Sequence, residues 1–122
     1  MRWTSAWLLL PLTVMAQSPS PPDFPADAMP LAGSELQARL SGKAFNAKLD
    51  DGQGWRMQYN ANGYVFLDTS RGFRDTGSWR VENNTLCINW QKVASGCSEM
   101  RATTGVLYLK RASGEVVPLT AE

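Results

Sequence analysis

The clearest pattern in the chain is an alternation of apolar and polar residues that begins near residue 43 and continues almost to the end. It is most regular over residues 76–90, where two alternating segments flank the pair Asn83-Asn84. Asparagine tolerates the positive φ of tight hairpins, so we expect a two-residue turn at this pair. With that turn, one face of the hairpin is apolar throughout: Trp79, Val81, Leu86, Ile88 and Trp90. The pattern predicts a half-buried antiparallel hairpin.

A second hairpin is expected upstream. Residues 55–59 alternate strictly, residues 60–63 are typical of a turn, and an apolar segment follows at residues 64–67. A two-residue turn at Asn62-Gly63 and a four-residue loop both place the same side chains on each face of the hairpin. In either case, we expect one inward face that carries these side chains: Trp55, Met57, Tyr59, Tyr64 and Phe66.

Further short strands are expected over residues 43–50, 106–109 and 116–119, with turn residues between them. About eight strands therefore follow one another without long crossovers. This pattern predicts an all-β fold, a small antiparallel up-and-down barrel or meander. One short N-terminal helix is expected before the strands, with Ser34 as its N-cap and Gly42 at its end.

Residues 1–32 have a different composition from the rest of the chain. Residues 1–16 have a charged start, a short apolar run and a small-residue cleavage site, which is typical of a secretory signal peptide. Residues 17–32 contain five prolines and are expected to be a linker that buries little surface. Residues 33–122 then form one β-barrel domain. We expect a periplasmic or secreted protein whose mature chain has no membrane span.

The chain has two cysteines, Cys87 and Cys97, and no histidine. In a secreted domain of this size, two cysteines most simply form a disulfide. The alternative is a catalytic or metal-binding pair, which the absence of histidine and the ten-residue spacing disfavour.

Charge and composition narrow the function classes. With Arg2 removed alongside the signal peptide, 11 basic residues face 11 acidic ones, whereas a nucleic-acid-binding domain is usually strongly basic. The chain has no histidine base, no glycine-rich phosphate loop and no Gly-x-Ser-x-Gly motif. We therefore expect no nucleic-acid partner, no cofactor, no metal and no enzymatic activity.

Aromatic and basic residues are the candidate binding residues. Trp55, Tyr59 and Tyr64 either fill the core of a small barrel or line a cavity that accepts a ligand. The loop at residues 71–75 places Phe73 between Arg71 and Arg74. Phe73 either caps the end of the barrel or anchors a partner, with the two arginines engaging an acidic or aromatic surface.

Several motifs between residues 34 and 101 carry a family resemblance: Leu40-Ser41-Gly42 at the end of the helix, the aromatic strand before Asn62-Gly63, residues 77–81, residues 86–90 and the second cysteine. On these motifs the chain resembles a loosely defined group of small secreted bacterial lipocalin-like (calycin-type) proteins, which are largely uncharacterised. The resemblance implies a small β-barrel in the cell envelope, and it implies no particular activity.

These observations favour a non-catalytic periplasmic or secreted binding or accessory module, whose partner is a small apolar ligand or an envelope protein. The alternative is an inhibitor of an envelope or foreign hydrolase, such as a lysozyme or protease. An inhibitor would act through an exposed loop, at residues 68–76 or 91–96. A lined cavity would favour ligand binding, and a protruding rigid loop would favour inhibition.

Overall fold

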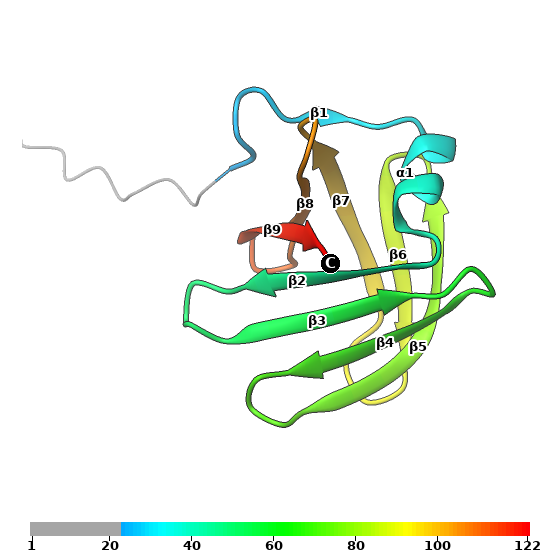
Figure 1. The fold of residues 1–122 in the computed structure, drawn as a ribbon, viewed down its shortest axis with the longest axis vertical. Helices are drawn as coiled ribbons and strands as arrows, with labels where there is room; N and C mark the ends of the chain where they lie inside the picture. The colour runs from blue at the N-terminus through cyan, green and yellow to red at the C-terminus, as the bar shows by residue number, and fades with distance from the viewer. Residues whose placement is uncertain (1–22) are drawn as a thin grey trace, which may run out of the picture.

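Successive hairpins close into an antiparallel barrel in the computed structural model, which describes residues 23–122. The barrel consists of β2 (Lys43–Lys48), β3 (Gly54–Tyr59), β4 (Tyr64–Thr69), β5 (Arg74–Glu82), β6 (Thr85–Trp90), β7 (Gly96–Ala102), β8 (Leu107–Lys110) and β9 (Val116–Ala121). Each strand pairs with the next, and β9 pairs with β2 to complete the closed eight-stranded meander (Figure 1). The predicted all-β barrel is therefore confirmed. The expected signal peptide lies outside the described residues.

The β5–β6 hairpin has the predicted register. Glu82 lies opposite Thr85 across the turn, and Trp79 lies opposite Ile88. Asn83 has a φ of 54°, the positive value expected of this turn. The inward side chains of both strands are buried or pack against the core, so the apolar face predicted for this hairpin is confirmed.

The β3–β4 hairpin differs from the prediction. Tyr59 pairs with Val65, and the Asn60 N–H donates to the Tyr64 carbonyl over 2.8 Å, so that three residues form the loop. Gly63 makes this loop possible because its φ of 93° is unfavourable for other residues. A loop with an odd number of residues exchanges the two faces of β4 relative to the prediction. Tyr64 and Phe66 therefore point outward, with 59% and 40% of their surface exposed, and the prediction that they share the inward face is wrong.

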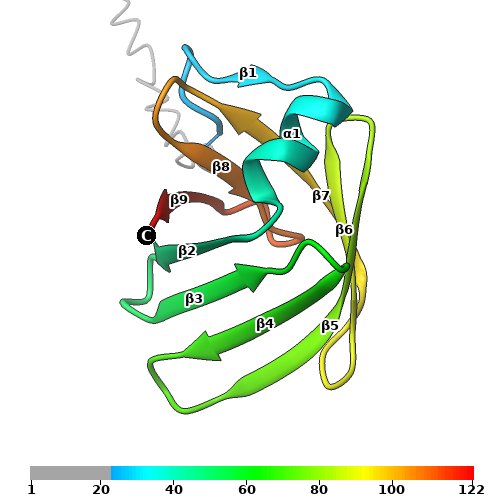
Figure 2. The same cartoon turned by 45° about the vertical axis from the view of Figure 1, so that its right-hand side comes forward.

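The helix α1 (Gly33–Leu40) covers one end of the barrel, with Leu36 and Leu40 fully buried against the core (Figure 2). Its N-cap is Ala32, with no capping side chain, so the assignment of Ser34 as N-cap is wrong. Gly33 is the first residue of the helix, and a Cβ there would lie 2.9 Å from the Asn83 carbonyl oxygen, so a larger residue would not fit without a shift.

The described part of the expected linker packs on the barrel. Phe24 and Ala28 are buried. The short strand β1 (Met29–Pro30) pairs with the last two residues of β7, which extend past the residues of β7 that pair with β6. The Arg101 guanidinium lies 4.5 Å from the centroid of the Phe24 ring, a cation–π distance. Most side chains of residues 23–32 are exposed or half-buried, and the segment contacts the barrel through Phe24, Ala28 and the pairing of β1 with β7.

Candidate functional site

The two ends of the barrel are built differently. In an antiparallel meander the loops alternate between ends, so α1 shares its end with the β3–β4, β5–β6 and β7–β8 loops. The other four loops, at residues 49–53, 70–73, 91–95 and 111–115, surround the opposite end, which α1 does not cover (Figures 1 and 2). A cavity of about 450 Å³ opens there. This volume lies within the range of about 300–1,000 Å³ typical of small-molecule sites.

The cavity has an aliphatic interior and an aromatic mouth. The interior is lined by inward aliphatic side chains of four strands: Met57 of β3, Leu67 of β4, Leu86 and Ile88 of β6, and Leu109 of β8. At the mouth lie Trp55 at the start of β3, Phe73 before β5, Trp90 at the end of β6 and Arg111 after β8. Gly96 and Ser98 of β7 also line the cavity, and their small side chains leave space beside the larger groups.

Arg111 is fixed at the mouth by two neighbours. Its guanidinium lies 4.9 Å from the centroid of the Trp55 ring, and its Nη1 donates to Glu115 Oε1 over 2.7 Å. The other carboxylate oxygen of Glu115 accepts the Asp50 N–H over 2.9 Å. The Asp50 N–H and the Arg111 guanidinium together lower the pKa of Glu115 against the opposing effect of burial, so its carboxylate is charged at neutral pH.

Asp75 organises the loop at residues 91–95, which forms one rim of the cavity. It is the only buried charged side chain in residues 23–122, with 3% of its surface exposed. Burial disfavours its charged form, but the backbone N–H groups of Lys92, Thr76 and Val93 donate to its carboxylate over 2.8–3.2 Å. These hydrogen bonds outweigh burial and lower the pKa of Asp75. The ionised carboxylate therefore holds the loop against β5.

The loops at residues 70–73 and 91–95 are also joined to each other. The Lys92 Nζ donates to the Arg74 carbonyl over 2.9 Å and lies 5.8 Å from the centroid of the Phe73 ring. The two segments suggested as inhibitory loops therefore form one continuous rim. Phe73 lines the cavity from this rim and keeps 39% of its surface exposed.

Of the binding residues expected from the sequence, some line the cavity and others lie elsewhere. Trp55 and Phe73 line the cavity. Tyr59 is fully buried at the closed end, where its ring contacts Trp79 edge-on, and burial raises the pKa of its hydroxyl. Tyr64 lies on the outer face of β4.

Arg71 and Arg74 are exposed at the rim and do not line the cavity. They form ion pairs with Asp51 and Asp68, at 3.4 Å and 2.7 Å.

Sequence reasoning missed Arg111 as a candidate. Its position follows the inward residues Leu107 and Leu109 at a spacing of two, so the strand alternation could have placed it at the inner rim. Trp90 was expected on the inward face but was not among the candidate binding residues. No sequence signal shows that the barrel end beside Trp90 lacks a cover.

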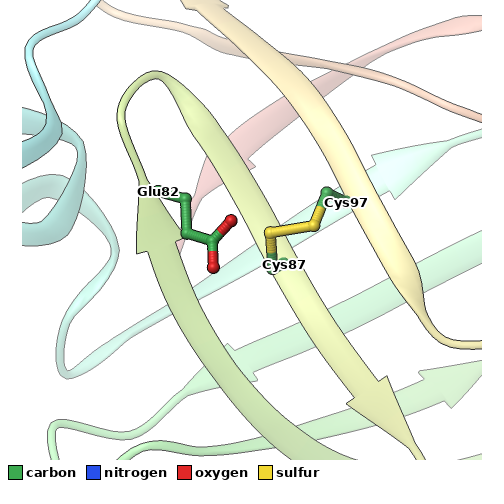
Figure 3. Close-up of side chains that lie close together, drawn as sticks. All are labelled: Glu82, Cys87 and Cys97. Atoms are coloured by element: carbon green, nitrogen blue, oxygen red, sulfur yellow. A yellow bond between two sulfur atoms is a disulfide. The ribbon is translucent and has the colours of Figure 1, made fainter.

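The predicted disulfide between Cys87 and Cys97 is confirmed, and it joins directly opposed residues of β6 and β7. The Glu82 carboxylate points toward it (Figure 3), and the three potential metal ligand atoms lie within 4.8 Å of one another. Both sulfurs are engaged in the disulfide, and Glu82 accepts a hydrogen bond from Arg80 Nε over 2.9 Å. This cluster is therefore a covalent connection beside the cavity rather than a thiolate site.

The fold and the cavity define a small closed antiparallel barrel with one covered end and one open end. Comparisons of the chain with protein-family models, with curated proteins and with solved structures found no match.

Within residues 23–122, no helix is long and apolar enough to cross a membrane.

Proposed function

We propose that this barrel is a non-catalytic binding protein that holds a small ligand with an apolar body. The observation that carries the proposal is the 450 Å³ cavity at the uncovered end, with its aliphatic interior and its mouth of Trp55, Phe73 and Trp90. Binding sites for small molecules are typically concave, mostly apolar and provided with few polar groups. The half-buried tryptophans at the mouth can gain contact area from a ligand without any change of fold.

We infer that the protein acts in the periplasm or outside the cell. The disulfide supports an oxidising compartment, and the N-terminal sequence of a signal peptide supports export. Intact-mass spectrometry of purified protein should show a mature chain that begins near Gln17 and no thiol that reacts without reductant. A retained leader or two alkylatable thiols would contradict the export hypothesis.

The binding proposal can be tested by filling the cavity. Gly96 lines it, its φ is not positive, and a Cβ built there has no neighbour within 4 Å. Because Gly96 lies opposite the inward residue Ile88, a Gly96→Phe side chain would project into the cavity. The probe is N-phenyl-1-naphthylamine, an uncharged apolar dye whose fluorescence rises on burial. The wild-type protein should bind it, and Gly96→Phe should reduce the affinity at least about tenfold.

The matched control is Gly105→Phe. Gly105 lies in the β7–β8 loop at the covered end and likewise has no neighbour within 4 Å of a built Cβ. It adds the same side chain far from the cavity, so its dye affinity should equal that of the wild type. Circular dichroism should show both variants folded. No dye binding by the wild type, or equal binding by both variants, would overturn the proposal.

The inhibitor hypothesis remains as a second candidate because the rim loops are held rigidly. Asp75 and Lys92 fix residues 91–95 against β5 and Phe73. Rigid exposed segments lose little entropy when they bind a partner. A pull-down of the tagged mature chain from envelope extract tests this hypothesis, and specific enrichment of a hydrolase would favour inhibition over ligand transport.

A further inference from the structure

The residues that line the cavity carry a single charge. Arg111 is the only charged side chain among them, and the others are apolar or uncharged polar groups. A charged group in a partly desolvated site interacts more strongly with a ligand than one in open water. The charge preference of a bound ligand should therefore depend mainly on Arg111.

The backbone of Arg111 lies in a tight turn. Its N–H donates to the Glu115 carbonyl over 2.8 Å, and its own carbonyl accepts the Gly114 N–H over 2.8 Å. The Trp55 ring and the Glu115 carboxylate then restrict the side chain. A group that is already positioned loses little conformational entropy when a ligand binds.

Arg111 retains hydrogen-bonding capacity. A guanidinium offers five N–H donors, and within residues 23–122 the Arg111 guanidinium forms one hydrogen bond, from Nη1 to Glu115. The guanidinium geometry matches two oxygens of one carboxylate or phosphate. Glu115 accepts one of the guanidinium N–H groups, and the remaining N–H groups are left for a ligand oxygen.

The other charges around the mouth do not reverse this preference. Arg71 and Arg74 are paired with Asp51 and Asp68, and none of the four lines the cavity. The buried Asp75 carboxylate accepts backbone N–H groups and does not line the cavity either. Glu115, the ion-pair partner of Arg111, offsets part of its charge but does not line the cavity either, so a cationic ligand would meet the guanidinium rather than a carboxylate.

We infer that the ligand is an amphiphile with an apolar body and one anionic oxygen group, which Arg111 binds at the mouth while the body occupies the aliphatic interior. This inference rests on the proposed function, because it requires that the cavity binds a ligand. It predicts a preference among molecules that share a body and differ only in the charge of the head group.

The test compares decanoate, decanol and decyltrimethylammonium, each measured by displacement of N-phenyl-1-naphthylamine at neutral pH. Wild-type protein should bind decanoate at least about tenfold more tightly than decanol, the range expected of a charge-assisted hydrogen bond, and the ammonium compound most weakly. Arg111→Gln should remove the preference for decanoate and leave decanol binding nearly unchanged. Arg111→Lys keeps the charge and should retain part of the preference.

Arg74→Gln is the matched control, because it removes an arginine from the same end of the barrel without changing the lining, and it should retain the full preference. Equal binding of the three head groups by the wild type, or an unchanged preference in Arg111→Gln, would overturn this inference and leave the proposed function intact. Failure of the dye and all three amphiphiles to bind would instead overturn the proposed function.

Discussion

The two ends of the barrel use similar residues for different purposes. At the covered end, Tyr59 contacts Phe45 and Trp79 edge-on, with ring centroids 6.0 Å and 5.6 Å apart. The indole Nε1 of Trp79 donates to the Asn60 carbonyl over 2.9 Å. Leu36 and Leu40 of α1 complete the packing, so that these three inward aromatic rings are buried.

At the open end, Trp55 and Trp90 also point inward, but they are only partly buried. No helix of residues 23–122 covers them, and Arg111 and Phe73 complete the mouth instead. Residue type and strand parity therefore do not decide whether an inward aromatic residue belongs to the core or to a site. What decides is the element that covers the end of the barrel, and in this chain that element is one short helix.

The largest effect is expected from truncation at the covered end. Trp79→Ala would leave a large void and remove the hydrogen bond to Asn60, which should reduce the free energy of unfolding by about 3–5 kcal/mol. A domain of this kind has a total stability of about 5–15 kcal/mol, so the variant should be close to unfolding. Urea denaturation monitored by circular dichroism measures the change.

Trp90→Ala is the matched control at the open end. It should cost clearly less stability than Trp79→Ala, since Trp90 is less buried, and it should weaken binding of the apolar dye. Equal destabilisation by the two truncations would show that the ends are energetically alike and would contradict the distinction between core and site.

The parts of the fold that sequence predicted correctly are those where local rules are sufficient. The β5–β6 hairpin has strict alternation on both strands and a two-residue turn, so its register and its apolar face followed from one turn. The disulfide followed from the presence of only two cysteines. The prediction for the β3–β4 hairpin was wrong because the loop length differs by one residue from the predicted one. Loops of two, three and four residues are all compatible with Asn62-Gly63, and only the odd length places Tyr64 outside.

The site was less predictable because it depends on long-range packing. Trp55 and Phe73 were among the candidates, but Tyr59 was assigned the same role although it lies under the helix. The sequence contains the two leucines of α1 but does not state which end of the barrel they cover. The pairing of β1 with β7 was missed for a related reason, since it depends on the edge of β7 that remains free beyond β6.

The second prediction concerns the disulfide, which joins β6 to β7 at the base of the open-end loop at residues 91–95. The Cys87→Ala/Cys97→Ala variant should lose about 2–3 kcal/mol of stability, because the eleven-residue ring no longer restricts the unfolded chain. Thermal denaturation measures this loss. Dye affinity should fall as well, since the loop beside the disulfide forms the cavity rim, and unchanged affinity would show that the rim is held without it.

The third prediction concerns Asp75, whose pKa is lowered in the folded protein. Its stabilising effect should be complete at neutral pH, above the unfolded pKa of about 3.9, and should be lost as the pH falls through the lower folded value. Asp75→Asn should therefore melt at a lower temperature than the wild type at pH 7, because its amide group presents N–H donors to the backbone N–H groups of Lys92 and Val93.

The difference between the melting temperatures of wild type and Asp75→Asn should shrink as the pH falls below about 4. Melting curves across a pH series test this dependence. Glu82→Gln is a control, because Glu82 is exposed and its partner Arg80 is exposed too. A gap for Asp75→Asn that is constant with pH would show that the carboxylate does not act through its charge.

The smallest effect is expected at the outer rim of the open end. Arg71 and Arg74 form ion pairs whose side chains are 47–81% exposed. Exposed pairs contribute about 0–1 kcal/mol, so Arg71→Ala/Arg74→Ala should unfold at nearly the wild-type urea concentration and bind the dye with unchanged affinity. Phe73→Ala in the same loop should weaken dye binding, because its ring lines the cavity. Weaker dye binding by the double arginine variant would instead place the outer rim within the ligand site.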